Sequence, residues 1–302
     1  MIRRMVFTGA LLAVVVAVGA EAAAAQLPLE MRNYPLTSLK KSGDLVAPFF
    51  DGWYNNGDGT ITYSFGFLNR NTEEIVDIPL GENNHIEPAQ YDGVQPTHFP
   101  VYNRRGFTGK RERGVFGVTV PDDQTEVLWT LTHAGRSYSV PGRAASPAYE
   151  LSREIAAFGS FAPAVRFSPT GTESQGPEGH MAQRVMATVG TAVTLSALVQ
   201  DRGDRYNFET DMDVFPVRAE FMLHQGPAPI EFEPMSVTVE TPGSEVEGAA
   251  SGAAWGMAST EATFSEAGEY IVRIRADNFG APDSRFDNMC CWTNAYVPVT
   301  VR

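Results

Sequence analysis

The adjacent cysteines Cys290 and Cys291, followed directly by Trp292, form the most unusual stretch of the sequence. In an oxidising compartment two neighbouring thiols can close a strained disulfide ring. Beside an indole, that ring would make a hard apolar platform for a sugar ring or another flat ligand. The interpretation we favour is a structural kink before the last strand, with Trp292 in the core, since tryptophan is highly buried on average. Two thiolates also suit copper(I) or zinc, although a structural zinc site needs a second, spaced pair.

Two histidines, His85 and His98, fall in one long segment with Glu82, Glu87 and Asp92 nearby. Imidazole together with carboxylate can bind zinc or copper. A metal-binding protein or metalloenzyme that uses His85 and His98 is therefore the alternative function. We favour scattered loop histidines, because none of the five histidines has the spacing of a known zinc motif.

Side chains with oxygen ligands gather at two predicted turns. Calcium requires six to eight oxygens, and neither turn matches an EF-hand loop. Asparagine and aspartate are common in turns without any ion, because they hydrogen-bond their own backbone. We therefore expect no bound cofactor, with calcium, zinc and copper as the alternatives. The residues concerned are Asn55, Asn56 and Asp58, and then Asp201, Asp204, Asp211 and Asp213.

A run of basic residues stands out in an acidic chain. It can grip an anionic polysaccharide or an acidic patch on a partner, since arginine offers bidentate contacts. A solvated loop flank is the interpretation we favour. The residues are Arg104, Arg105, Lys110, Arg111 and Arg113.

The sequence lacks the familiar catalytic motifs. It has no Gly-x-Ser-x-Gly motif, and no Rossmann or Walker glycine loop follows a strand-to-helix pattern. Carboxylates are plentiful, but nothing selects two of them as a glycosidase pair. We therefore expect a protein that is not an enzyme.

Composition restricts the partners and the source of stability. The formal net charge is −13, and such a surface repels nucleic acid, because phosphate binding needs clustered Lys and Arg. Only two cysteines are present, which excludes a framework of several disulfides. Stability must come from packed cores, for which an apolar content of 43% is sufficient.

The first residues have the pattern of a secretory signal peptide. Arg3 and Arg4 give a positive start, Met5 to Gly19 are mostly apolar, and small residues end at Ala25 before Gln26. The apolar stretch is short for a membrane span, which needs about 20 residues. We predict a secreted or periplasmic protein whose mature chain does not insert into a membrane.

Alternating polar and apolar residues after the leader predict strands. Thr60–Leu68 alternates and follows a turn with Asn-Gly and Asp-Gly pairs at residues 56–59, the strongest short hairpin signal. Residues 126–132 and 136–140 are predicted to pair across His133-Ala134-Gly135. Gly81 to Gly114 is predicted to be a long loop, often a functional feature. Several short strands over about 100 residues favour a sandwich.

The second half repeats the β pattern after a break. Tyr149 to Phe158 allows one short helix, and residues 164–167 then begin a strand. Thr191–Val199 and Tyr270–Ala276 alternate strictly, which implies sheets with one buried and one wet face. We predict an all-β fold with two β-sandwich domains in series and a connector rich in proline and glycine. The predicted ranges are a signal peptide over 1–25, a leader arm over 26–43, the N-terminal sandwich over 44–141, the connector over 142–162 and the C-terminal sandwich over 163–302.

Two levels of resemblance accompany this pattern. Residues 191–203 (TAVTLSALVQDRG) and 263–278 (TFSEAGEYIVRIRADN) resemble strands of PKD and Ig-like extracellular domains. In those domains a PGxY turn tucks its tyrosine toward the core; here Gly268-Glu269-Tyr270 keeps the turn, with Ala267 in place of proline. The mature chain is also similar to a group of uncharacterised secreted bacterial proteins, through GWYNNGDGT (52–60), QPTHF (95–99), RGVFGVTVP (113–121) and CCWTN (290–294). The resemblance implies β-sandwich domains that serve in binding, spacing or display, and it supplies no activity that can be transferred to this chain.

We therefore expect an exported, non-catalytic binding or structural module whose ligand is a carbohydrate or a surface partner. Exposed aromatic rings would stack on sugar faces, so burial of both Trp53 and Trp292 would exclude the carbohydrate version. An architectural spacer is a further hypothesis. The candidate contacts are Trp53, Tyr54, His98, Arg104 and Arg105 in the first domain and Cys290, Cys291 and Trp292 in the second.

The signal-peptide pattern predicts the start of the mature protein. Mass spectrometry of the protein made in a secreting host should find Gln26 at the N-terminus, because Ala23-Ala24-Ala25 fits an A-x-A cleavage site. A product that still begins at Met1 and stays inside the cell contradicts the prediction.

Overall fold

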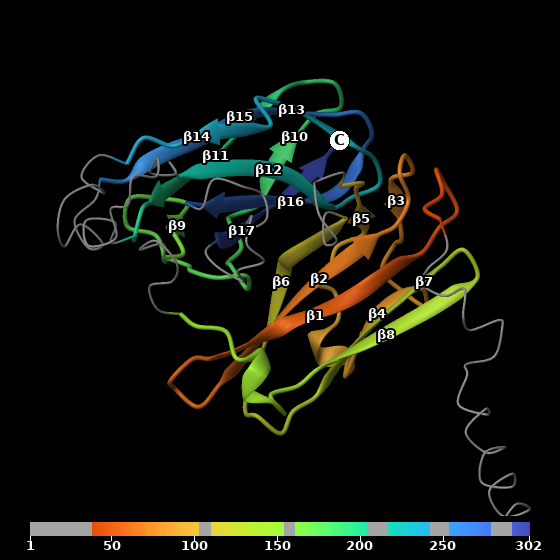
Figure 1. Cartoon of the computed structure of the whole chain (residues 1–302). Helices are drawn as coiled ribbons and strands as arrows, with labels where there is room; N and C mark the ends of the chain where they lie inside the picture. The colour runs from red at the N-terminus through yellow and green to blue at the C-terminus, as the bar shows by residue number, and fades with distance from the viewer. Residues whose placement is uncertain (1–37, 103–109, 154–160, 204–216, 242–253, 279–291) are drawn as a thin grey trace, which may run out of the picture. The chain divides into compact units, whose positions relative to one another are not determined.

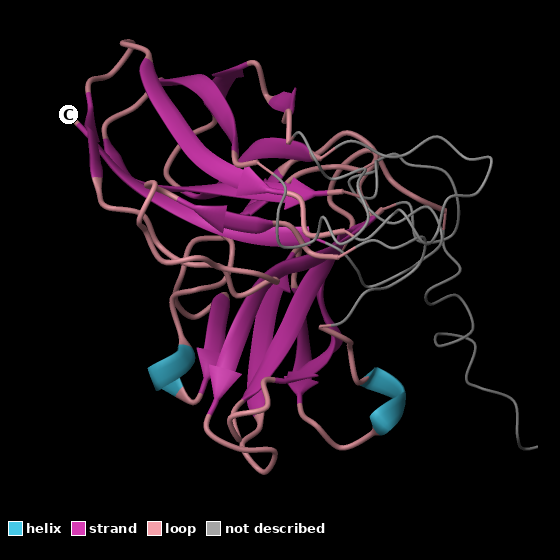
Figure 2. Cartoon of the chain, turned by 90° about the vertical axis from the view of Figure 1, so that its left-hand side faces the viewer, coloured by secondary structure: helices cyan, strands magenta, loops and turns pink. Residues whose placement is uncertain are grey.

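The chain forms two β-sandwiches in series, and the prediction of an all-β fold is confirmed. The computed structural model describes residues 38–102, 110–153, 161–203, 217–241, 254–278 and 292–302. Strands dominate Figure 2, with the short helices η2 (Ala89–Tyr91) and η3 (Pro147–Tyr149) in cyan. None of the helices in the described part of the chain has the length and apolarity to cross a membrane. The signal-peptide residues lie outside these ranges, and the domain boundaries remain predictions.

The N-terminal sandwich packs a three-stranded sheet, β1-β2-β6, against a second one, β4-β7-β8 (Figure 1). Aromatic rings fill the space between them: Phe65 stacks on Phe116, and Trp129 meets both rings edge-on. A short pair, β3-β5, lies beside them. The strands are β1 (Val46–Asn55), β2 (Ile61–Asn69), β3 (Val76–Asp77), β4 (Asn84–Glu87), β5 (His98–Phe99), β6 (Arg111–Val120), β7 (Val127–His133) and β8 (Arg136–Gly142).

Both predicted hairpins are present. β1 and β2 pair antiparallel and close with Asn55 opposite Ile61. The Asn55 side chain accepts the Gly57 N–H at 2.9 Å, so the oxygens of this turn are used by the turn itself. In the second hairpin, β7 and β8 join through Ala134 and Gly135, both at positive φ. Two such residues make a type I′ turn, whose twist matches that of the strands.

The C-terminal sandwich has the strand order of an immunoglobulin-like fold. One sheet runs β13-β15-β11-β9 and the other β10-β17-β16-β12-β14. In chain order these correspond to the D-E-B-A sheet and to a G-F-C sheet with an extra strand at each edge. The strands are β9 (Ala164–Arg166), β10 (Val185–Ala187), β11 (Val193–Gln200), β12 (Arg218–Gln225), β13 (Ile230–Glu233), β14 (Ser236–Thr238), β15 (Gly256–Phe264), β16 (Gly268–Asp277) and β17 (Trp292–Val301).

The turn before β16 agrees with the resemblance to Ig-like domains. Tyr270 is buried, and its hydroxyl donates to the Glu266 carbonyl at 2.9 Å. A tyrosine near the start of the sixth strand that bonds back to the chain just upstream is a hallmark of the immunoglobulin fold. Gly268, at φ +153°, lies against Pro227, where a Cβ would come within 2.8 Å of the proline ring. Glycine is therefore required at this corner.

One local prediction is wrong, and a second falls mostly outside the described residues. The segment from Gly81 to Gly114 is not one loop, because it contains β4, β5 and the start of β6. Of the helix expected over Tyr149–Phe158, residues 154–158 lie outside the described residues. Within the described part, Tyr149 ends the short helix η3, Glu150 bridges to Trp53, and the Leu151 N–H donates to the Trp53 carbonyl at 2.7 Å. At β4 and β5 tertiary pairing overrides a local pattern that contained few strand formers.

The expectation of one wet face also fails for β2 and β17, which are buried along almost their whole length. Their second faces are covered by other parts of the chain. Gly117 on β6, for example, lies against Glu178, and Asn294 on β17 donates to the Pro177 carbonyl at 2.9 Å. Polar residues on these faces are thus buried by contacts between segments distant in sequence.

Candidate functional site

The aromatic residues predicted to bind a sugar are buried. Trp53 is 9% exposed and donates its indole N–H to the Ser146 carbonyl, and Trp292 is 4% exposed. Tyr54 lies under the Arg153 guanidinium, and burial raises the pKa of its hydroxyl. Stacking on sugar needs an open ring face. The carbohydrate hypothesis, which depended on exposure of Trp53 or Trp292, is therefore wrong for these residues.

Several other candidates lie outside the described residues: Arg104, Arg105, Cys290, Cys291, Asp204, Asp211 and Asp213. The rest of the basic run is not a solvated flank. Lys110 donates to the Asn71 carbonyl at 2.9 Å, Arg111 pairs with Asp51, and Arg113 is buried. These side chains are held by contacts around β6, so they do not form an exposed binding site for an anion.

The two histidines of the metal hypothesis lie in different sheets. His85 is on β4, with its Nδ1 3.1 Å from the Glu82 carbonyl oxygen. His98 is on β5, with its Nδ1 2.7 Å from an Asp77 carboxylate oxygen. Within the ranges that the structure describes, no group of three His, Cys, Asp or Glu side chains is placed to hold a metal.

A buried ion cluster joins the two sandwiches. Glu112 of β6 is 1% exposed, and its carboxylate accepts from Arg273 at 3.1 Å and from Arg275 at 2.9 Å, both on β16. Arg273 also donates to the Val115 carbonyl at 3.0 Å. One carboxylate thus faces two guanidinium groups, and Asp277 adds a second carboxylate 3.7 Å from Arg275. We call the contacts of β6 with β16 and β17 the Glu112 seam.

A bulge in β6 makes room for the Trp292 indole in this seam. The β2–β6 register shifts between Phe65 and Phe67, and Gly114 in the bulge has φ +53°. Trp292 and Asn294 donate to the Gly114 carbonyl at 3.1 Å and 2.8 Å. A Cβ on Gly114 would lie 2.0 Å from the indole, so only glycine fits. Bulges commonly re-aim the chain at such places.

Asp51 supports the bulge from the first sandwich. Its carboxylate accepts the Gly114 N–H at 2.7 Å and pairs with Arg111. Burial raises the pKa of the Asp51 carboxyl, although Arg111 and the Gly114 N–H partly offset the shift.

A second polar contact joins residues 93–97 to the end of β12. His224 has its Nε2 2.8 Å from the Val94 carbonyl, and Gln225 donates to Gly93 at 2.9 Å and to Gln95 at 2.7 Å. The Thr97 N–H donates to the His224 carbonyl at 2.8 Å. Burial and the nearby Arg273 lower the pKa of His224 to about 3.

Between these two contacts lies an apolar groove of about 330 Å³, to which both sandwiches contribute. Ile75 and Met235 remain 53% and 56% exposed at this groove. Of the predicted ligand contacts, His98 lines it. Its other lining includes Phe67, Pro96, Pro100 and Tyr102 from the first sandwich and Met222, Leu223, Pro229, Ile230 and Phe232 from the second.

Sequence reasoning missed Glu112, Arg273, Arg275, His224 and Met235. One signal was present: Arg273 and Arg275 alternate with apolar residues in VRIRA, so both point to the supposedly wet face of β16. Two arginines on one strand face of an acidic chain indicate a partner carboxylate elsewhere. Nothing in the sequence identified Glu112 as that partner, because it lies 161 residues from Arg273.

Removal of the seam carboxylate should destabilise the protein strongly. Glu112→Gln leaves two buried guanidinium groups without their shared anion, and loss of one partner of a buried pair costs about 3–5 kcal/mol. Urea unfolding measures the difference. The matched control is Glu126→Gln, whose pair with Arg143 is mostly exposed and contributes at most about 1 kcal/mol. Equal effects of the two substitutions would contradict a seam held by charge.

Acid should destabilise the protein through His224. Burial lowers the pKa of His224 from its ordinary value of 6.5 to about 3. The neutral side chain therefore makes its full contribution to the free energy of unfolding above pH 6.5, and this contribution is lost as the pH falls toward 3. The loss is on the order of 1 kcal/mol per pH unit. His224→Gln should remove this part of the pH dependence in urea unfolding at pH 7, 5.5 and 4, whereas the control His85→Gln should keep it. The raised pKa of Asp51 changes the stability with pH in the opposite direction. This contribution is the same in every variant, so it cancels when the variants are compared.

Comparisons with known proteins do not assign a family. No family model and no curated protein matches the chain. Among solved structures it is similar to titin Ig tandem domains A164-A165, at 12% identity and a TM-score of 0.20 over 86% of this chain and 99% of that one. The D0-D1 domain of intimin is 11% identical, with a TM-score of 0.23 over 85% and 100%. Domains 4 and 5 of the S-layer protein SbsC are 11% identical, with a TM-score of 0.21 over 85% and 98%. Scores this low carry no argument, so the immunoglobulin-like fold rests on the strand order above.

Proposed function

We propose that this chain is an exported, non-catalytic binding module that holds an apolar segment of a surface protein partner in the groove at the Glu112 seam. The observation that carries the proposal is the groove itself, because Ile75 and Met235 remain largely exposed where two polar contacts fix the two sandwiches together. Exposed apolar residues gathered in a groove commonly mark a binding site.

The chemistry of the lining favours a protein segment over a sugar. Met222, Met235 and Ile230 offer flexible aliphatic surface, and methionine adapts to side chains of different shapes. Two of the polar groups at the groove are already engaged: His98 contacts Asp77, and Arg273 contacts Glu112. The mostly apolar lining supports binding by burial of apolar surface.

The seam gives the groove a fixed width. Its two walls belong to different sandwiches, so independent motion of the sandwiches would open and close it. Hydrogen bonds between the two sandwiches oppose such motion, with partners on β6, β12 and β16. A preformed groove binds more tightly because less ordering is required when the partner arrives. Export to the partner's compartment rests on the predicted signal peptide.

Site-specific photo-crosslinking tests the groove. A photoreactive residue replaces Met235 in the groove, and another replaces Met257 on β15, which is 68% exposed and does not line it. In cells that secrete the protein, the position at Met235 should crosslink to one defined protein and the position at Met257 should not.

The captured protein is then purified and titrated against the full mature chain. Met235→Glu should weaken binding about tenfold, since a buried charge in an apolar contact costs at least about 1.4 kcal/mol, whereas Met257→Glu should leave the affinity unchanged. Equal crosslinking at both positions, or equal loss of affinity in both variants, would overturn the proposal.

A further inference from the structure

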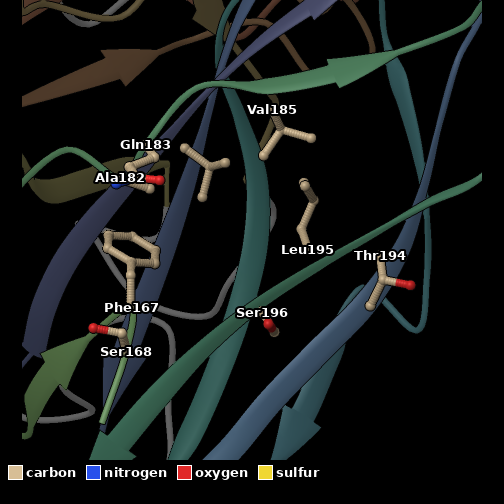
Figure 3. A pocket seen from close by; sticks show the side chains of 9 residues that line it. Phe167, Ser168, Ala182, Gln183, Val185, Thr194, Leu195 and Ser196 are labelled. Carbon is tan, nitrogen blue, oxygen red and sulfur yellow. The ribbon is translucent and has the colours of Figure 1, made fainter. Parts of the chain in front are cut away.

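A second hollow lies within the C-terminal sandwich, away from the seam. It has a volume of about 340 Å³ and opens between β10 and β11. Figure 3 shows Phe167, Val185 and Leu195 around it, with Thr194 and Ser196 on the neighbouring part of β11. Leu195 belongs to the core of this sandwich, so the hollow gives access to core side chains from outside.

The hollow exists because the chain changes sheets at this edge. β9 pairs with only the last three residues of β11, Leu198 to Gln200. The chain then leaves that sheet, and β10 pairs in parallel with Val299 to Val301 of β17 on the other one. Residues Val193 to Ala197 of β11 pair with β15 on one side. Within the described ranges, no strand pairs with them on the other side.

The open half of β11 lacks the charged residues and prolines that commonly block strand addition. Natural edges are blunted by proline, by lysine or by inward charges. Here the residues are Val193, Thr194, Leu195, Ser196 and Ala197, with neither charge nor proline. A free edge of this kind can bond an added strand through backbone groups, while pockets select its side chains.

The surroundings specify the chemistry of that strand. On its inner face one apolar side chain, such as valine or leucine, would enter the hollow between Leu195 and Val185. On its outer face the sheet is acidic: Glu233 lies directly opposite Glu261, and the Thr194 hydroxyl donates to Glu261 at 2.6 Å. Like charges opposite each other destabilise a sheet, so lysine or arginine on the added strand would be favourable.

We propose that Val193–Ala197 of β11 is a docking edge for an extended strand of another protein, with an apolar residue in the hollow and basic residues on the outer face. The pairing extends the β13-β15-β11 sheet in line with β9. This site does not depend on the groove at the seam, because none of its lining residues belongs to that groove.

The test uses a capped peptide of sequence TVKVKVT and the full mature chain, with hydrogen exchange as the readout. The peptide is added at up to about 1 mM, so that binding with a Kd as weak as about 1 mM is still detected. Amide protection should rise over residues 193–197 and stay unchanged over 93–97 at the seam. A TVEVEVT peptide should protect much less, because its charges repel the Glu261 face. No change over 193–197 with TVKVKVT would overturn the proposal.

A pair of substitutions separates binding at the edge from nonspecific binding. Ala182 lines the hollow, so Ala182→Phe should fill it and weaken the peptide about tenfold, equivalent to about 1.4 kcal/mol. Ala89→Phe, at an exposed position on η2, is the control and should bind like the wild type. Equal affinity of both variants would overturn the proposal. Protection of 193–197 that rises with protein concentration alone would instead identify a second copy as the occupant.

Discussion

The buried carboxylate of Glu112 is the central polar contact between the two sandwiches. It lies between Arg273 and Arg275 with almost no access to solvent. Charges in such a place are expensive to bury and are tolerated only when paired with good geometry. The ion cluster therefore favours one arrangement of β6 against β16 over sliding alternatives, which would leave a guanidinium group buried without its anion. The Gly114 bulge and the Trp292 indole fit the same arrangement.

The groove is a consequence of that constraint. Once β6 is fixed on β16 and residues 93–97 on β12, the space between the two contacts is bounded by side chains from both sandwiches. Its exposed apolar rim is then a stable feature of the surface. The hollow beside β11 has a different origin, since it arises within one sandwich where the chain changes sheets. The protein thus has two surfaces of different character. The groove presents apolar side chains, and the edge of β11 presents backbone groups.

Local signals predicted much of the fold. The Asn-Gly and Asp-Gly turn before Ile61, the type I′ turn at Ala134 and Gly135, and the tyrosine corner at Tyr270 are each determined within a few residues. The site was predicted far less well. His98 lines the groove, but Trp53 and Trp292 are buried, because a large amphipathic ring serves a core as readily as a ligand.

The sequence by itself determined that the chain would form sheets, where many of the strands run, and that its formal net charge is −13. These properties follow from alternation, turn chemistry and charge, all of which act locally or as sums. Only the tertiary structure decided which polar residues face each other. Glu112 and Arg273 are 161 positions apart, and neither residue type nor spacing specifies such a pair. The seam and the groove depend on contacts of this kind, which arise only when whole sheets are placed against one another. The open edge of β11 depends instead on how β9 and β10 are distributed between the two sheets.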